Sequence, residues 1–370
     1  MTTRRLDILP LQEWALFDRR PLKVIAGPCG AETREQVLDT ARELKALGVD
    51  LFRAGIWKPR TYPGSFEGVG AKGLAWLTEA REKYGIKVIT EVASAGHVKQ
   101  CLEAGIDALW VGARTTANPF LVQEIADALK GTDIPVLVKN PVSPDLGLWI
   151  GALERLNRAG VRKLGVIHRG VTTFQKQKYR NDPQWQLAVE MRSAFPSLLF
   201  FVDPSHIAGH REYVREVAQC SLDLGFEGLM IESHCCPAMA LSDADQQLTP
   251  LQLGELLNNQ LQVRNADSDA PQWKENIDLL RAKIDVIDET ILSALSSRME
   301  ISRQIGRYKK ENNIAILQTS RWDAVLERVI EKGRSYGLSE EFVTEIFNAI
   351  HEESVESQNQ ILSESSSQQK

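Results

Sequence analysis

The sequence has few cysteines and no long apolar run. Its 370 residues include five cysteines, an odd and sparse set that is a poor basis for a disulfide framework. No stretch approaches the roughly 20 apolar residues of a transmembrane helix, and the N-terminus lacks an apolar core of signal-peptide length. These absences predict a cytoplasmic protein without membrane partners.

Charge and glycine spacing argue against two further classes of protein. The net charge of −5 gives no reason to expect a nucleic-acid partner. No G-x-G-x-x-G motif follows the first apolar run, which weakens a dinucleotide-binding interpretation. The length exceeds what one core usually serves, so the sequence predicts two domains.

Short β-rich apolar runs alternate with amphipathic stretches through the first two thirds of the chain. The runs span residues 22–27, 50–56, 87–92, 108–113, 135–140, 163–168, 198–205 and 228–233. Continuous apolar strands joined by helices indicate a parallel sheet covered on both faces. Eight such units predict an α/β fold, a (β/α)8 TIM barrel over residues 1–261, with a doubly wound open sheet as the alternative.

Charged or metal-ligating side chains follow the C-terminal ends of these runs, where the active sites of barrels are built. They are Cys29, Lys58, Arg60, Glu91, Arg114, Lys139, His168, Arg169, Asp203, His206 and Glu232. A single one of them is more often a solvated loop charge, but a full set of strand ends predicts a shared site.

This set divides by chemistry into cations and metal ligands. The cations Arg53, Lys58, Arg60, Arg114, Lys139 and Arg169 suit substrates that carry phosphate and carboxylate groups. Cys29, His206, Glu232 and Asp243 offer sulfur, imidazole and carboxylate oxygens, which suit a divalent ion of the Mn, Fe, Co or Zn class. His206 alone fits a structural histidine equally well, and for Cys29 a buried or nucleophilic role remains an alternative.

Eight motifs occur in the order of a known family. They are GPC (27–29), KPRT (58–61), TEV (90–92), GAR (112–114), KNP (139–141), HRG (168–170), DPSH (203–206) and IES with ALSD (231–243). Over residues 20–261 the chain resembles 3-deoxy-D-arabino-heptulosonate 7-phosphate (DAHP) synthase of the compact type Iβ. That enzyme condenses phosphoenolpyruvate with erythrose 4-phosphate in the first step of aromatic amino-acid biosynthesis.

The resemblance implies roles for individual positions. Cys29, His206, Glu232 and Asp243 match metal ligands; Arg114, Lys139 and Arg169 match the phosphoenolpyruvate site, with Arg53, Lys58 and His168 beside it; Arg60 and Thr61 match the erythrose 4-phosphate site. Glu91 also falls at an active-site position and is our candidate base for the attacking water, with Lys58 or a metal-linked water as alternatives. Tyr62 stands where a serine or threonine is expected.

The last third of the chain changes from strand patterns to helices. Residues 262–272 have linker composition, and residues 363–370 are expected to be a disordered tail. The first helix, predicted over 273–311, carries one apolar seam and spans roughly 55 Å at 1.5 Å per residue. Because this is too long for a small monomeric domain, we expect an intertwined homodimer over residues 273–362. Further helices are predicted at 319–334 and 339–362.

The spacing of cations distinguishes this segment from a plain coiled coil. Arg298 and Lys309 lie within about 20° on one helix face, and Arg281 lies about 100° away, within reach of a partner's pocket. The pattern resembles the all-helical chorismate mutases, which convert chorismate to prephenate. The resemblance implies that Arg281, Arg298, Arg321 and Ser354 bind substrate and that Lys309 and Gln358 act on the ether oxygen. Gln318 and Trp322 depart from it, since acidic residues are expected there.

The fusion of these two activities predicts feedback regulation. The helical domain would bind chorismate or prephenate and inhibit the barrel. Two alternatives remain open: the helical domain is a non-catalytic dimerising sensor, or the barrel is a related phosphoenolpyruvate-dependent sugar-acid synthase.

Overall fold

The computed structural model describes residues 5–18, 20–58, 64–173, 178–265, 271–317 and 319–363. Its contacts divide the chain into two compact units, residues 1–266 and 267–370. Four residues of the sequence analysis, Arg60, Thr61, Tyr62 and Gln318, lie outside the described residues, as do part of the linker and most of the C-terminal tail.

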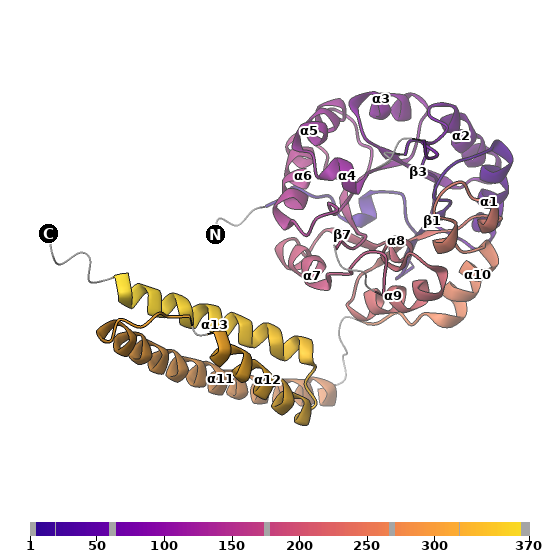
Figure 1. The fold of residues 1–370 in the computed structure, drawn as a ribbon. Helices are drawn as coiled ribbons and strands as arrows, with labels where there is room; N and C mark the ends of the chain where they lie inside the picture. Colours follow the sequence, from indigo (N-terminus) through magenta and orange to yellow (C-terminus); the bar gives the residue numbers. More distant parts are fainter. Residues whose placement is uncertain are drawn as a thin grey trace. The chain divides into compact units, whose positions relative to one another are not determined.

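The first unit is a closed barrel of eight parallel strands, which confirms the predicted fold (Figure 1). The strands are β1 (Lys23–Gly27), β2 (Leu51–Arg53), β3 (Lys87–Val92), β4 (Ala108–Val111), β5 (Val136–Lys139), β6 (Leu164–His168), β7 (Leu199–Val202) and β8 (Gly228–Glu232). Each strand pairs with the next, and β8 pairs with β1 from Lys23 opposite Gly228 to Gly27 opposite Glu232. Closure therefore places the ends of β1 and β8, with their flanking loops, side by side.

Helices surround this sheet and pack their apolar faces on it. They are α1 (Arg34–Ala46), α2 (Lys72–Tyr84), α3 (Ala95–Glu103), α4 (Ala113–Thr116), α5 (Pro119–Ala128), α6 (Leu146–Arg158), α7 (Trp185–Ala194), α8 (Pro204–Ala208), α9 (Arg211–Asp223) and α10 (Pro250–Glu255). Several begin at side-chain N-caps; Thr33 accepts from the Gln36 amide and Asp145 from the Leu148 amide. These caps define the residue at which the preceding loop ends and the helix begins.

The barrel interior is filled by alternate residues of the strands. Ile25, Leu51, Ile89, Leu137 and Ile167 belong to one buried cluster together with Trp14 and Leu16 of the segment before β1. Lys87, the first residue of β3, donates a hydrogen bond to the Ala15 carbonyl, so this segment lies at the N-terminal ends of the strands. The side chains that follow the strands therefore lie at the other end of the barrel, at the C-terminal ends of the strands.

The second unit consists of three helices, α11 (Pro271–Glu311), α12 (Thr319–Ser335) and α13 (Glu340–Ser363). α11 and α13 run side by side in Figure 1. Several apolar residues of the predicted seam along the first half of α11 are more than half exposed in the described chain: Leu280 is 53% exposed and Ile287 is 58% exposed. None of the described helices combines the length and apolar composition needed to cross a bilayer.

Gly27, the last residue of β1, provides a test of the close approach of β1 to β2 in the barrel. It has φ +150°, and a Cβ there would meet the Arg53 carbonyl oxygen at 2.0 Å. We expect Gly27→Ala to lower the free energy of unfolding by about 3 kcal/mol or more, because backbone must move to relieve the clash. Gly131, with φ +78° and open space around it, is the control, and Gly131→Ala should cost about 1 kcal/mol. Equal losses in urea unfolding followed by circular dichroism would contradict this account.

Candidate active sites

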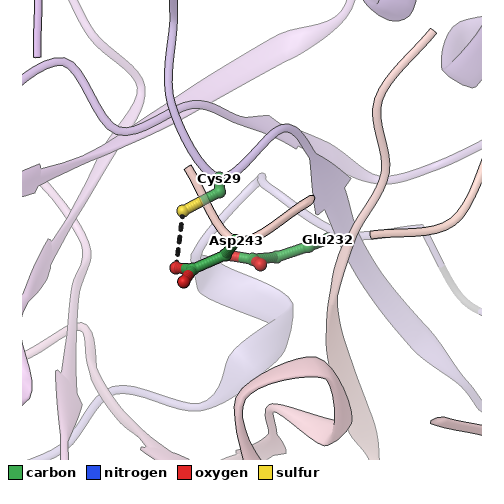
Figure 2. Close-up of side chains that lie close together, drawn as sticks. All are labelled: Cys29, Glu232 and Asp243. Atoms are coloured by element: carbon green, nitrogen blue, oxygen red, sulfur yellow. Dashed lines mark hydrogen bonds between the residues drawn. The ribbon is translucent and has the colours of Figure 1, made fainter. Parts of the chain in front are cut away.

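A thiol and two carboxylates meet beyond the ends of β1 and β8. One ligand atom each from Cys29, Glu232 and Asp243 can be chosen so that all lie within 4.8 Å of one another. The Cys29 thiol donates to Asp243 Oδ2 at 3.2 Å (Figure 2). Glu232 ends β8, Cys29 follows β1, and Asp243 lies in the loop after β8, so barrel closure brings the three together.

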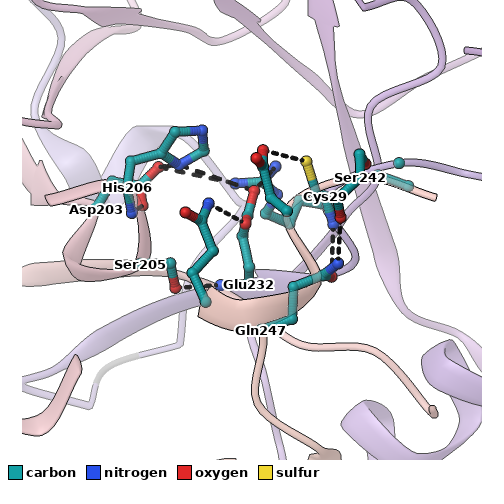
Figure 3. A network of polar contacts seen from close by, with 12 residues as sticks. Cys29, Asp203, Ser205, His206, Glu232, Ser242 and Gln247 are labelled. Carbon is teal, nitrogen blue, oxygen red and sulfur yellow. Dashed lines mark hydrogen bonds and ion pairs between the residues drawn. The ribbon is translucent and has the colours of Figure 1, made fainter. Parts of the chain in front are cut away.

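Hydrogen bonds hold these three residues in place (Figure 3). The backbone amide of Cys29 donates to Gln247 Oε1 at 2.9 Å, and Gln246 Nε2 donates to Glu232 Oε2 at 2.6 Å. Asp243 has a left-handed backbone at φ 50°, and the Arg180 guanidinium contacts its Oδ1 at 2.9 Å. Such outer contacts fix the orientation of metal ligands.

The donor set fits a divalent cation. Sulfur with two carboxylates, and the His206 imidazole nearby, suits a borderline ion better than Mg²⁺ or Ca²⁺, which prefer oxygen alone. Burial, followed by the charge of Glu232, raises the pKa of the Cys29 thiol to about 12. The thiol is therefore neutral unless a strong positive charge is bound next to it. His206 is not one of the three clustered residues: its Nδ1 lies 2.8 Å from Asp203 Oδ2 and 3.8 Å from Glu232 Oε1.

A buried ionic network lies behind this group. Asp203 and Glu232 are fully buried, and Arg53 reaches both, at 3.8 Å and 3.1 Å respectively. Lys139 Nζ lies 2.7 Å from Asp203 Oδ2. Burial alone would raise the pKa of Asp203, but the charges of His206 and Lys139 outweigh it and hold that pKa well below its usual range. The network therefore keeps Asp203 ionised although its side chain is fully buried.

A small cavity of about 60 Å³ opens beside the network. Its lining includes Glu91, Arg114, Lys139, Arg169 and His206. Burial lowers the pKa of the Arg169 guanidinium to about 10, still high enough to leave it charged at neutral pH. Glu91 accepts a hydrogen bond from Trp110 Nε1 at 3.1 Å. The cavity thus combines several cations with one carboxylate, an arrangement that can hold an anion next to a base.

The helical unit has a second pocket, of about 270 Å³, formed by all three helices. Arg298 and Lys309 come from α11, Arg321 from α12, and Ser354 and Gln358 from α13. Arg298 Nη1 donates to Ser354 Oγ at 2.6 Å, and Gln358 Nε2 donates to Ser302 Oγ at 3.0 Å. Three cations and two neutral hydrogen-bonding side chains suit a small dicarboxylate.

Comparison with known proteins now assigns both units. Residues 17–267 match the DAHP synthetase I family, and residues 280–359 match chorismate mutase type II. The chain belongs to the DAHP synthetase I family. It is a DAHP synthase-type barrel followed by a chorismate mutase-type helical domain.

Individual relatives resemble the barrel. A phospho-2-dehydro-3-deoxyheptonate aldolase of Thermotoga maritima is 35% identical over 226 residues, which is 61% of this chain and 64% of that protein, so the chain spans just under two thirds of this relative. Its crystal structure, at 33% identity, has a TM-score of 0.58 and covers 65% of this chain and 68% of that one. A 2-dehydro-3-deoxyphosphooctonate aldolase of Desulfotalea psychrophila is 30% identical over 272 residues, 67% of this chain and 91% of that protein.

Two sequence-predicted residues of this DAHP synthase-type protein do not line the described cavity of the barrel. His168 does not line the described cavity: its Nε2 bonds the Pro183 carbonyl, its ring packs near Trp149 and Trp185, and burial lowers its pKa to about 4. Arg53 is 1% exposed and faces carboxylates of the network.

Arg281, predicted to reach a partner's pocket, does not line the pocket of its own helical unit: its side chain is 68% exposed and pairs with Asp278 at 3.7 Å.

Lys58 and two residues that the sequence analysis missed contact the cluster of Cys29, Glu232 and Asp243 or the cavity beside it. Lys58 Nζ donates to the Cys29 carbonyl and lies 3.1 Å from its sulfur. Arg180, which holds Asp243, was missed because it lies in an irregular loop without a repeating pattern. Asn181 was missed for the same reason; its Oδ1 accepts from Arg169 Nη1 at 2.9 Å.

Proposed function

We propose that the barrel condenses phosphoenolpyruvate with erythrose 4-phosphate to give DAHP and inorganic phosphate. The observation that carries this proposal is the cavity of Glu91, Arg114, Lys139 and Arg169 beside the cluster of Cys29, Glu232 and Asp243. A cationic anion site and a metal-ligand group at one barrel mouth fit two phosphorylated reactants, one of which is an aldehyde.

The cations first bind and align the reactants. Arg114, Lys139 and Arg169 neutralise the phosphate and carboxylate of phosphoenolpyruvate, which would otherwise repel the second phosphate. The position of Arg60 and Thr61 in the KPRT motif assigns them to that second phosphate. Holding the enol carbon against the aldehyde carbon converts an encounter in solution into an oriented reaction.

Cys29, Glu232 and Asp243, with His206, would hold a divalent ion of the Mn, Fe, Co or Zn class. Such an ion supplies Lewis-acid polarisation of the aldehyde oxygen when bound. Lys58 Nζ lies 3.1 Å from the Cys29 sulfur and adds positive charge next to it.

In this proposal Glu91 takes the proton from the water that adds to the enol-derived carbon. It lines the cavity, and Trp110 fixes one of its oxygens. The other oxygen occupies space that Gly112 leaves, since a Cβ there would lie 2.0 Å from Glu91 Oε1. Loss of phosphate from C2 then completes DAHP.

Replacement of Cys29 tests the barrel assignment. We expect Cys29→Ala to lower phosphate release from phosphoenolpyruvate and erythrose 4-phosphate at least about 100-fold, because removal of a ligand weakens metal binding. A chelator should silence the wild type, and metal content measured by mass spectrometry should fall in the variant.

Cys220→Ala is the control, since Cys220 lies on α9 away from the cluster. Full wild-type activity without metal would contradict the metal site. Faster turnover of arabinose 5-phosphate than of erythrose 4-phosphate would instead favour a related phosphoenolpyruvate-dependent sugar-acid synthase.

We propose that the helical unit rearranges chorismate to prephenate. The pericyclic step needs no acid or base, so the protein selects the folded conformer and stabilises charge on the breaking ether bond. Arg298, Arg321 and Ser354 hold the carboxylates, and Lys309 and Gln358 donate to the ether oxygen.

We also propose that this unit forms a homodimer. The first half of α11 leaves Leu280, Ile284, Ile287 and Ile291 each more than half exposed, and an apolar face of this size is typical of a protein interface. Arg281 lies in this half of the helix, so it would reach the pocket of the second copy.

Mixing two inactive variants tests the shared site. Arg281→Ala and Arg298→Ala should each lower chorismate turnover at least about 100-fold, since each removes a charge-assisted contact to a carboxylate. Co-refolded, they should regain part of the activity, because one site of each mixed dimer has both arginines intact. Arg303→Ala, an exposed change on the same helix that pairs with Glu300, is the control. No recovery in a mixture shown to contain mixed dimers would contradict a shared pocket.

We propose that prephenate or chorismate bound to the helical unit inhibits the barrel in this cytoplasmic enzyme. The fusion of an early and a late reaction supports this, and coupling requires that the ligand bind two states of the protein with different affinity.

We expect prephenate to inhibit the wild-type condensation and to leave Arg298→Ala uninhibited, because that variant cannot bind the ligand. Steady-state condensation rates with and without prephenate measure this, with Arg303→Ala as the control. Insensitivity of the wild type at saturating prephenate would contradict feedback inhibition.

A further inference from the structure

The pocket of the helical unit is strongly cationic. Arg298, Lys309 and Arg321 line it, and no aspartate or glutamate is among the lining residues that the structure describes. A dianion that enters this pocket therefore meets positive charge without a carboxylate to orient its uncharged groups.

One wall of the pocket is an aromatic pair. The rings of Trp322 on α12 and His351 on α13 stack with centroids 4.0 Å apart and an interplanar angle of 12°, and both residues line the pocket. Both side chains are half-buried. Within the described part of the chain, no hydrogen bond satisfies a ring nitrogen of either residue. The wall thus presents a titratable imidazole, fixed in orientation by the indole, to whatever occupies the pocket.

The charges around His351 disfavour its protonated form while the pocket is free. Burial lowers its pKa, the charges of Arg298 and Lys309 on α11 lower it further, and Glu352 on α13 opposes them. From α12, Arg321 and Trp322 share the pocket with it. The free pocket therefore holds a neutral imidazole at pH 7.

We propose that His351 takes up one proton from solvent when a dicarboxylate binds this pocket, and that Trp322 is the positioning residue that keeps the imidazole at the wall. The inference rests on the proposed mutase function of this unit. A bound dianion offsets the positive charge of Arg298 and Lys309, which favours the imidazolium. The imidazolium then supplies a charge-assisted donor to the ligand, where a neutral ring would supply a weaker one.

Proton uptake sets the direction of the pH dependence. If the ligand complex binds the proton more tightly than the free pocket does, ligand affinity increases as the pH falls through the range between the two titrations. A rise of half a unit to one unit in the pKa of His351 on binding corresponds to about three- to tenfold tighter binding at a pH below both titrations, and to less at a pH between them. The affinity should become constant at a pH above both titrations, where His351 is neutral in the free and in the ligand-bound pocket.

Titration calorimetry of the full-length protein with prephenate between pH 6.0 and 8.5 tests this inference. The wild type should bind about two- to fivefold more tightly at pH 6.0 than at pH 8.5, less than the full ratio because the imidazole of the free pocket is not fully protonated at pH 6.0. Repeating the titration near pH 6.5 in two buffers of different ionisation enthalpy should show proton uptake, a measurement that needs no variant. The KM for chorismate should decrease as the pH is lowered, as the dissociation constant of prephenate does, and kcat should change less.

Variants separate charge from stacking. His351→Gln keeps a hydrogen-bonding side chain without a titratable ring, and its affinity should not change with pH over this range. Trp322→Phe should keep the pH dependence, whereas Trp322→Ala should reduce it. His210→Gln, an exposed histidine change in the barrel, is the control and should behave as the wild type.

The outcomes distinguish this inference from the function on which it rests. Chorismate turnover and prephenate binding that show neither pH dependence nor proton uptake would overturn the role of His351 and leave the mutase assignment intact. The absence of both turnover and binding at every pH would overturn the mutase assignment and this inference together. Persistence of the full pH dependence in a folded His351→Gln would assign the proton to another group and overturn the inference.

Discussion

The buried pair of carboxylates, Asp203 and Glu232, is the constraint on which the barrel site depends. Neither has exposed side-chain surface, and an unpaired buried charge is among the costliest features a fold can contain. Arg53 and Lys139 make burial tolerable by supplying positive charge at 2.7–3.8 Å. Strand β1 lies between β2, which carries Arg53, and β8, which carries Glu232. The close approach of Gly27 to the Arg53 backbone is part of the same arrangement, because Arg53 has to reach past β1 to Glu232.

The two units use positive charge in different ways. In the barrel, Arg53 and Lys139 are matched with carboxylates of the protein, so these cations are oriented before any ligand arrives. In the helical pocket, the hydrogen-bond partners of Arg298 and Lys309 among the described residues are neutral oxygens, the Ser354 hydroxyl and the Ile316 carbonyl. The first arrangement favours precise placement, and the second keeps more of its charge for the ligand.

Sequence patterns predicted the barrel and the strand ends well, because apolar runs and their spacing depend on local chemistry. Whether a side chain at a strand end points into or out of the barrel depends on the alternation along its strand. The sequence analysis identified residues at strand ends without using this alternation. Ile167 belongs to the interior cluster, so His168 after it points out of the barrel toward Trp149. Contacts between distant loops, such as Arg180 with Asp243, and between helices, such as Trp322 with His351, leave no periodic signal in one sequence.

The pairing of β8 with β1 also bears on how such a chain is assembled. A ring of strands without a free edge has no position at which further sequence can join the sheet. Whatever is appended after β8 and α10 must build a hydrophobic core of its own. An added module can therefore be gained, lost or exchanged through evolution while the polar groups at the ends of the strands keep their places.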